Sequence, residues 1–279
     1  MPVTTSQQIA RYYDQFQKTD ITFTKEVIRA ILLHPKQVYL KCLGYQWPCI
    51  IYSTSMSEAR VIVNMQKSLK ESLQKANNMV SLRFCFVQRD KTDPLSFFVS
   101  AKISGFTPYG KDKPDLFFLT VSYTQRPPDD LIEILGQMLE ANLNSSKRKD
   151  DRIVVTADSA KRLGLRAKET QIIIDGVPRR AIIRDLSFAG AKVIILGIAK
   201  FLVDKQAVLR IDLLDPPESL DIAGTVVRYE PVEGRPDIAA FAVLFDEAQV
   251  PMKYKLRINN YLKYVKLKKP AGERNDTTE

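Results

Sequence analysis

The chain has 279 residues, of which 45% are hydrophobic and 27% charged, and its formal net charge at pH 7 is +10. This length and composition indicate a globular protein with room for two modest domains, and they exclude a largely disordered chain. The sequence contains neither an apolar run long enough to cross a membrane nor an N-terminal secretory or lipidation signal, so we expect a cytoplasmic protein without membrane insertion.

The cysteines and the single histidine limit the chemistry. Cys42, Cys49 and Cys85 form no CxxC pair, and His34 is not placed to complete a metal-ligand cluster with them. We therefore expect buried free thiols and no metal site. Because nucleophilic catalysis would have to recruit His34, which has no nucleophile motif nearby, we expect no catalytic residues and a protein that is not an enzyme.

The first half reads as two helices followed by strands. Helical patterns cover about 5–17 and 24–33, and a further helix is expected near 66–75. Short β-branched or aromatic runs separated by turn residues predict strands. These strands are expected at 38–43, 49–53, 59–63, 80–87, 96–103 and 116–123. Six short strands predict a small antiparallel β-barrel.

A helix and a polar linker follow this barrel. Pro127 and Pro128 followed by Asp129 and Asp130 are typical of a helix start. The apolar stripe of this helix is expected to pack on the first barrel. Its residues are Leu131, Ile134, Leu135, Met138 and Leu139. The next residues are polar and have no hydrophobic period, so we place a first domain at 1–142 and a hinge linker at 143–152.

The second half predicts another barrel. Strands are expected at 153–155, 171–174, 180–184, 191–195, 206–213, 221–228 and 239–244, with residues 159–168 forming a connection inside the barrel. A closing helix over 252–267 is expected to turn Leu256, Tyr261, Leu262 and Val265 toward the barrel. This domain covers 153–269, and the polar tail 270–279 is expected to be disordered. The fold class is therefore mainly β with α: two small antiparallel β-barrels with flanking helices.

Two short motifs carry most of the functional information. Arg148 and Arg152 form an RxxxR pair in the linker, and Asp185, Ser187 and Gly190 form a DxSxxG turn between two apolar strands. Together and in this order the two motifs resemble the signature of the PilZ family, over roughly residues 147–266. The resemblance implies that the two motifs jointly bind the bacterial second messenger cyclic di-GMP as a ligand rather than as a catalytic cofactor.

The residue types of the two motifs suit that ligand. An arginine guanidinium matches the O6/N7 edge of guanine and can also stack on the purine or bind a phosphate. Asp185 can accept hydrogen bonds from guanine nitrogens, and Ser187 can donate to a base or a phosphate. Gly190 lets the backbone approach the ligand or adopt a positive φ. Lys147, which precedes the RxxxR pair, is a further candidate ligand-binding residue.

The first half is similar to the PilZ-like N-terminal domains of flagellar brake proteins and of spirochaete two-domain PilZ proteins, and it shows no matching ligand motif. The resemblance implies a cyclic di-GMP receptor in which binding at the hinge orders the two domains. The receptor would then signal to an unknown protein partner, flagellar or regulatory, with motility or virulence as the process by analogy.

Three alternatives remain open at this point. Arg162 and Arg166 also satisfy RxxxR, although they lie in the expected connection rather than on the segment that enters the barrel. The ligand binds either as a monomer or as a stacked dimer. The basic C-terminal stretch indicates, as an alternative function, a nucleic-acid-binding regulator that a ligand controls. Its cations are Lys253, Lys255, Arg257, Lys263, Lys266, Lys268 and Lys269.

Overall fold

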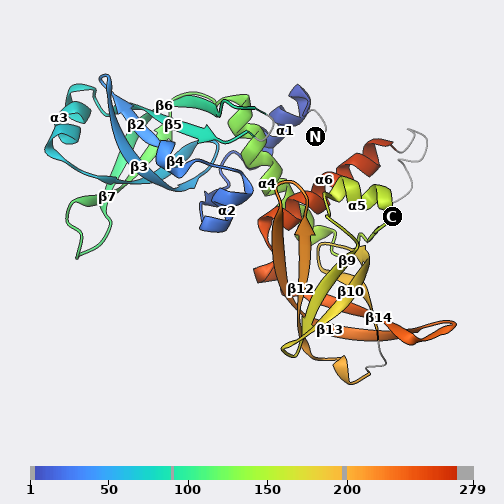
Figure 1. Ribbon diagram of the computed structural model, residues 1–279. Coiled ribbons are helices and arrows are strands. Elements are labelled where there is room, and N and C mark those ends of the chain that lie inside the picture. The colour runs from blue at the N-terminus through green and yellow to red at the C-terminus, as the bar shows by residue number, and fades with distance from the viewer. Residues whose placement is uncertain (1–3, 89–90, 197–199, 269–279) are drawn as a thin grey trace. The chain divides into compact units, whose positions relative to one another are not determined.

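The structure is a computed structural model that describes residues 4–88, 91–196 and 200–268. The chain divides into two compact units, residues 1–139 and 140–279 (Figure 1). The tail that the sequence predicts over 270–279 lies outside the described residues.

The first unit is built on a closed antiparallel barrel. Its strands are β1 (Ile21–Thr22), β2 (Tyr39–Cys42), β3 (Tyr45–Thr54), β4 (Glu58–Asn64), β5 (Met79–Phe86), β6 (Leu95–Pro108) and β7 (Leu116–Tyr123). Six strands run in the order β3-β2-β5-β6-β7-β4, and the pairing of β4 with β3 closes the ring, while short β1 adds to β3. Alternate residues point inward, so that Leu40, Leu82 and Leu119 are fully buried in the core.

Helices cover parts of this barrel. They are α1 (Ser6–Phe16), α2 (Lys25–Ala30), the 3-10 turn η1 (Pro35–Gln37), α3 (Lys67–Lys75) and α4 (Asp129–Lys147). Thr5 and Thr24 cap α1 and α2, because each side chain accepts a hydrogen bond from a backbone N–H of the first turn. Cys42, Cys49 and Cys85 are free and buried, which confirms the expectation from the sequence.

The second unit repeats the same topology. Its strands are β8 (Ile153–Val154), β9 (Glu169–Ile174), β10 (Val177–Leu186), β11 (Gly190–Leu196), β12 (Gln206–Leu213), β13 (Glu218–Val232) and β14 (Arg235–Phe245). The ring runs β10-β9-β12-β13-β14-β11 and closes through β10 and β11, with short β8 added to β10. The predicted fold class, two small antiparallel barrels in a mainly β protein with helices, is confirmed.

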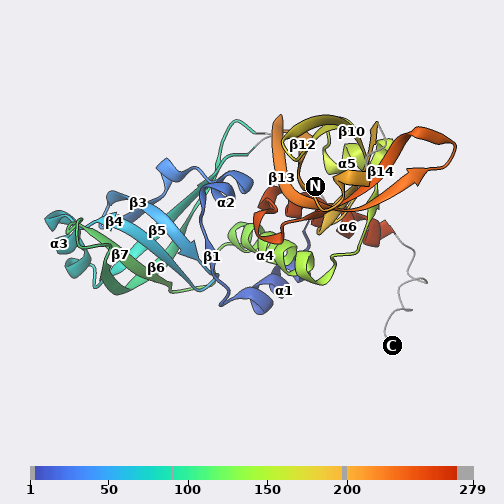
Figure 2. The same ribbon diagram turned by 90° about the horizontal axis from the view of Figure 1, so that it is seen from below.

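The helices of the second unit were predicted only in part. They are α5 (Ala157–Leu163), η2 (Lys200–Leu202), η3 (Glu247–Gln249) and α6 (Met252–Lys268). Helix α5 lies in the segment predicted to be a connection, where Thr156 and Ser159 form a capping box and Gly164 ends the helix at φ 70°. It lies beside α6 (Figures 1 and 2).

The closing helix α6 was predicted correctly, but the residues it buries were predicted only in part. Tyr254 and Ile258 are buried in the barrel core, and Tyr261 and Leu262 pack against that core while partly exposed. Only the last two belong to the predicted face. Among the described residues, none of the helices combines the length and apolar character needed to cross a membrane.

Helix α4 continues into the segment that the sequence predicts as a linker. It ends at Lys147, and the division between the two units falls within it. The buried side chain of Ser145 donates a hydrogen bond of 2.7 Å to the carbonyl of Asn142. Ala141 and Ser145, four residues apart, are both buried, and the side chain of Asn144 donates a hydrogen bond of 2.7 Å to Asn259 on α6, so tertiary contacts stabilise this polar end of the helix.

Gly136 offers a test of how α1 packs on α4. A β-carbon at this position would lie 2.4 Å from Cδ2 of Tyr12, whose ring is fully buried. Alanine favours a helix over glycine by about 1 kcal/mol, but overpacking costs about 1–3 kcal/mol and can exceed that range. We expect Gly136→Ala to lower the free energy of unfolding of the first unit by about 1–2 kcal/mol.

Trp47 is the single tryptophan and lies on β3, so its fluorescence during urea unfolding reports on the first unit. Gly110→Ala is the matched control, because a β-carbon there meets no atom within 4 Å. An unfolding midpoint of Gly136→Ala equal to that of the control would contradict the packing described.

Candidate functional site

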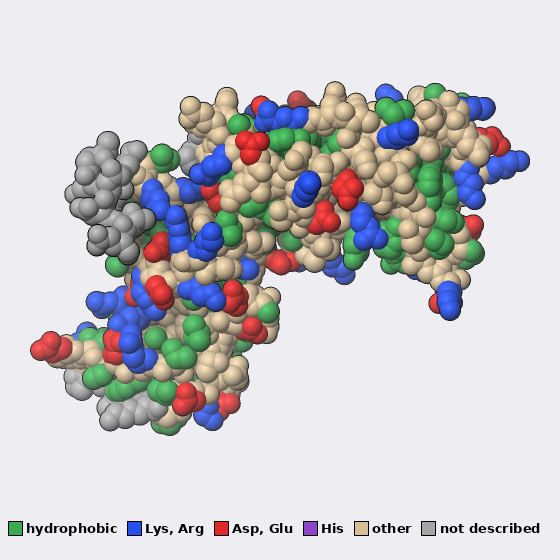
Figure 3. Space-filling view, turned by 180° about the vertical axis from the view of Figure 1, so that it is seen from behind, with side chains coloured by type: hydrophobic (Ala, Val, Ile, Leu, Met, Phe, Trp, Pro, Cys, Tyr) green, Lys and Arg blue, Asp and Glu red, His purple; other side chains and the backbone are tan. Residues whose placement is uncertain are grey.

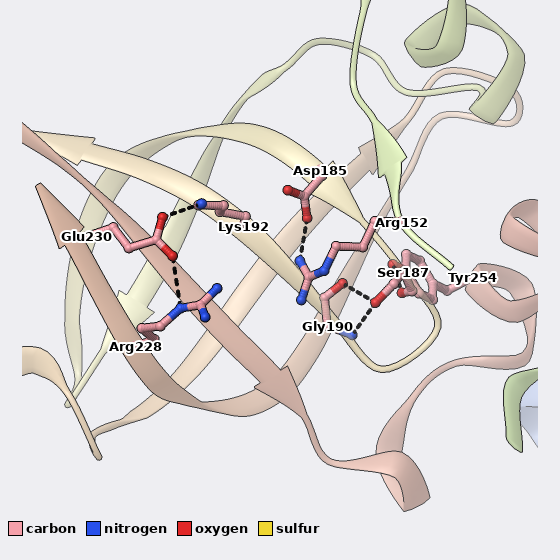
Figure 4. A network of polar contacts seen from close by, with 8 residues as sticks. All are labelled: Arg152, Asp185, Ser187, Gly190, Lys192, Arg228, Glu230 and Tyr254. Atoms are coloured by element: carbon pink, nitrogen blue, oxygen red, sulfur yellow. Dashed lines mark hydrogen bonds and ion pairs between the residues drawn. The ribbon is translucent and has the colours of Figure 1, made fainter. Parts of the chain in front are cut away.

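One ion pair joins the two motifs that the sequence singles out. Strand β8 pairs with the end of β10, with Ile153 opposite Leu186 and Val154 opposite Asp185. Arg152 precedes β8 and therefore lies beside Asp185. Its Nη1 donates a hydrogen bond of 2.6 Å to Oδ1 of Asp185 (Figure 4). The Asp185 side chain is 13% exposed and that of Arg152 is 47% exposed, so the guanidinium still faces solvent.

The turn between β10 and β11 is held by hydrogen bonds within the motif. The N–H of Ser187 donates to the carbonyl of Gly190 at 2.8 Å, and the N–H of Gly190 donates to Oγ of Ser187 at 3.1 Å. Ser187 is 1% exposed, and its hydroxyl donates to the Gly190 carbonyl at 3.3 Å. This hydroxyl therefore shapes the turn.

Helix α6 contacts the same turn through a buried side chain. The hydroxyl of Tyr254 donates a hydrogen bond of 2.7 Å to the carbonyl of Ser187, and its ring packs edge-on against Phe245. Burial raises the pKa of the Tyr254 phenol, and the charge of nearby Asp185 adds to this effect, so the hydroxyl keeps its proton.

The close packing of a neighbouring strand requires a glycine at residue 190. It does not adopt a positive φ, so that part of the sequence interpretation is wrong. A β-carbon at this position would lie 2.3 Å from the carbonyl oxygen of Val243 on β14. Glycine therefore allows the start of β11 to approach β14 closely.

The other candidates lie at the end of α4 or just after it. The N–H of Arg148 donates to the carbonyl of Asn144 at 2.8 Å, which continues the helical pattern, and Arg148 is half-buried. Its guanidinium has no hydrogen-bond or ion-pair partner among the residues that the structure describes. Lys147 is exposed. Lys149 forms an ion pair of 2.6 Å with Glu247, which lowers the pKa of that carboxyl.

The alternative RxxxR pair is engaged elsewhere. Arg162 on α5 donates to Asp158 at 2.9 Å, and its guanidinium lies 4.1 Å from the ring centre of Tyr264 on α6. Arg166 is exposed just beyond α5. Since Arg152 is the arginine that bonds Asp185, the geometry favours the pair on the segment entering the barrel.

Three charged residues that the sequence did not single out extend the site. Lys192 on β11 is opposite Asp185 in register and forms an ion pair with Glu230 on β13. Arg228 forms a second ion pair with Glu230, with 2.9 Å between its Nε and Oε1 of the carboxylate (Figure 4). We call Arg152, Asp185, Lys192, Arg228 and Glu230 the charged row. Its members come from four strands or their ends, so only the strand register brings them together.

The charged row offers cations to an anion and acceptors to N–H donors. Three of its members are cations, and Arg152 and Arg228 are more than 45% exposed. A cavity of about 170 Å³ behind the turn is lined by residues including Ser145, Phe188 and Phe245. It is smaller than the roughly 300 Å³ at which pockets for small molecules begin, so the charged row is the better candidate surface for a large ligand.

The first barrel holds different side chains at the equivalent positions. Both barrels have a β-bulge at the same place, between Ile51 and Ser53 in one and between Ile183 and Asp185 in the other. The hydrogen bonds of Ser55 with Glu58 repeat those of Ser187 with Gly190. The strand registers then place Asp20, Ser53, Glu58, Arg60, Gly105 and Thr107 at the positions of Arg152, Asp185, Gly190, Lys192, Arg228 and Glu230.

The side chains at these positions of the first barrel do not repeat the charge pattern of the charged row. Asp20 replaces the arginine of the ion pair, and Ser53 replaces its carboxylate. Arg60 is the cation that remains, and it lies 4.9 Å from the ring centre of Phe118 and 5.6 Å from that of Tyr52. The equivalent face of the first barrel is therefore aromatic where the second barrel has its charged row.

Comparisons with known proteins agree with these observations. Residues 7–142 match the PilZN3 domain family, and residues 146–262 match the PilZ domain family. A protein of Treponema denticola named cyclic di-GMP binding protein is 45% identical over 273 residues, which cover 98% of this chain and 86% of that protein.

Solved structures are more distant. PlzA of Borreliella burgdorferi in complex with c-di-GMP is 22% identical, with a TM-score of 0.42, and the match covers 92% of this chain and 98% of PlzA. YcgR of Escherichia coli in complex with c-di-GMP is 9% identical, with a TM-score of 0.29 and coverage of 95% and 92%.

Proposed function

The chain belongs to the two-domain PilZ proteins, with a PilZN3 domain followed by a PilZ domain, and on that premise we propose that it is a receptor for cyclic di-GMP. The observation that carries the proposal is the ion pair between Arg152 and Asp185 beside the Ser187–Gly190 turn. The cyclic di-GMP binding protein of Treponema denticola supports the choice of ligand.

Each motif residue has a proposed role. Arg152 turns from Asp185 toward the ligand and binds a guanine edge or a phosphate, and the half-buried Arg148 joins it from the end of α4. Asp185, released from the arginine, accepts from guanine N–H donors. Ser187 and Gly190 hold the turn in shape, and Lys147 adds a cation near the phosphates.

The side chains of the two barrels support one binding site in each chain. The second barrel has the arginine, the carboxylate and the glycine, whereas the first has Asp20, Ser53 and Glu58 at the equivalent positions. A carboxylate in place of Arg152 would repel phosphates. We therefore assign the first domain to output or partner docking, with a flagellar or regulatory protein as the partner in the bacterial cytoplasm.

Calorimetric titration of the full chain tests the ligand and the site together. We expect selective binding of cyclic di-GMP over cyclic di-AMP and GTP. Each lost bidentate arginine contact is worth about 1–3 kcal/mol, which is about tenfold to a hundredfold in affinity. Arg148→Ala with Arg152→Ala should therefore weaken binding by about a hundredfold or more.

The matched control is Arg162→Ala with Arg166→Ala, which removes the same two charges from the alternative RxxxR pair. Its affinity should equal that of the natural protein. Normal binding by the Arg148/Arg152 double variant would refute the site, and absence of cyclic di-GMP binding by the folded natural protein would refute the function. A ligand-to-protein ratio near one or near two distinguishes a bound monomer from a stacked dimer.

We further propose that the ligand orders the two domains. The working division is a first domain over 1–142, a hinge over 143–152 whose first residues continue α4, and a PilZ domain over 153–269. Both arginines lie just beyond the end of α4, the helix within which the two units divide, so a ligand that holds them would restrict the connection between α4 and the PilZ barrel. Only a ligand with different affinities for two arrangements can shift the balance between them.

Spin labels on the two domains test this ordering. Lys111→Cys and Gln171→Cys place labels at exposed residues of the two units, and the native cysteines are buried and unlabelled. Cyclic di-GMP should narrow the distance distribution between the labels, and the Arg148/Arg152 double variant should not respond. An unchanged distribution at saturating ligand would contradict ordering without affecting the binding site.

Three of the cations on which the nucleic-acid alternative depends have partners within the chain. Lys253 pairs with Glu218, Lys263 pairs with Glu140, and Arg257 donates to the carbonyl of Asp215. Figure 3 likewise shows Lys and Arg side chains interspersed with Asp and Glu on the visible face. Lys269 and the side chain of Lys268 lie outside the described residues. Binding to DNA or RNA that falls steeply with salt would restore this alternative.

A further inference from the structure

Glu230 is a carboxylate within the surface that we propose binds a ligand with two phosphates. Its side chain is 37% exposed, and it contacts two cations, Lys192 and Arg228. Burying negative charge beside a phosphate is unfavourable, so the position of this carboxylate requires an explanation.

Strand geometry accounts for how the three side chains meet. Lys192 on β11 and Arg228 on β13 are both opposite Ala242 of β14, and Glu230 is opposite Ala240. Because alanine side chains are short, long side chains from the two outer strands can meet over β14. The two alanines are only 5% and 7% exposed, as expected of residues that neighbouring side chains cover.

Charge keeps this group together in the free protein. The hydrogen bond from Lys192 lowers the pKa of the Glu230 carboxyl, and the charges of Arg228 and Arg152 lower it further. Glu230 is therefore ionised at neutral pH, and it is placed between cations as a phosphate oxygen would be. Asp185 stands in the same relation to Arg152 at the other end of the charged row.

We propose that Glu230 is an internal counter-ion that takes the place of a ligand phosphate in the free protein and is displaced from Lys192 and Arg228 when cyclic di-GMP binds. This inference rests on the proposed function of the second barrel. Glu230 thereby limits affinity, because binding has to separate it from its cations and leave it near the phosphates. Other anions would also have to displace Glu230 from its two cations, so Glu230 weakens their binding to the free site as well.

A purely structural role predicts the opposite result. If Glu230 positioned Lys192 and Arg228 for the ligand, neutralising it would release both cations and weaken binding. Glu230→Gln separates the two roles, because it removes the charge and keeps the shape of the side chain. Removing one partly exposed like charge should tighten cyclic di-GMP binding by about tenfold, since solvent screens part of the repulsion.

Asp221→Asn is the matched control. Asp221 lies on the same strand and pairs with Arg210 of β12 at 2.8 Å, and that arginine lowers its pKa as the charged row lowers that of Glu230. Its neutralisation changes the net charge of the chain by the same amount, on the side of β13 that faces away from β14. Glu230→Ala is a second variant, which also removes the hydrogen bonds that glutamine could keep.

The experiment is calorimetric titration of the full chain and its three variants with cyclic di-GMP, after thermal unfolding has verified that each is folded. Tighter binding by both Glu230 variants, with Asp221→Asn unchanged, supports the counter-ion. If the natural protein binds cyclic di-GMP and Glu230→Gln binds it equally or more weakly, the inference about Glu230 is overturned and the proposed function stands. An equal gain in affinity for Asp221→Asn would mean that the change in net charge alone causes the effect, and it would also overturn the inference about Glu230. No binding by any folded protein would overturn the proposed function itself.

Discussion

The close approach of β11 to β14 at Gly190 is the constraint on which the second barrel and its site depend. Strand β11 closes the ring with β10 on one side and pairs with β14 on the other. The carbonyl of Val243 occupies the space that a side chain at residue 190 would need. The same turn brings the end of β10 to β8, which sets Asp185 beside Arg152. The close approach at Gly190 and the ion pair thus lie at the two ends of one short turn.

The two barrels share a backbone pattern and differ in the side chains at the positions that we propose bind the ligand. Strand order, bulge and turn hydrogen bonds are repeated, and a different set of side chains stands on the same backbone. At one pair of equivalent positions, Lys192 bonds a carboxylate, whereas Arg60 lies over the ring of Phe118. A shared topology thus does not imply a shared function, which has to be argued from the residues on the surface.

Much of this architecture could be predicted from the sequence, because short β-branched or aromatic runs between turn residues indicate strands. The continuation of α4 after Asn142 could not be predicted from a hydrophobic period, because it is stabilised by the burial of Ser145 and by the hydrogen bond from Asn144 to Asn259 on α6. Helix α5 was missed because its capping residues, Thr156 and Ser159, carry the signal rather than a hydrophobic period. The motif residues were identifiable because each motif is contiguous. Lys192, Arg228 and Glu230 were not, because strand register alone makes them neighbours.

We propose that only the second of two barrels with the same strand order binds the ligand, and that it does so through its charged row. Backbone amide mapping by NMR of the full chain during a cyclic di-GMP titration tests it most directly. The account predicts that the amides of Asp185, Ser187, Gly190 and Lys192 shift, while those at the equivalent positions Ser53, Ser55, Glu58 and Arg60 stay in place. Shifts centred on the first barrel, or of equal size at both sets of positions, would contradict it.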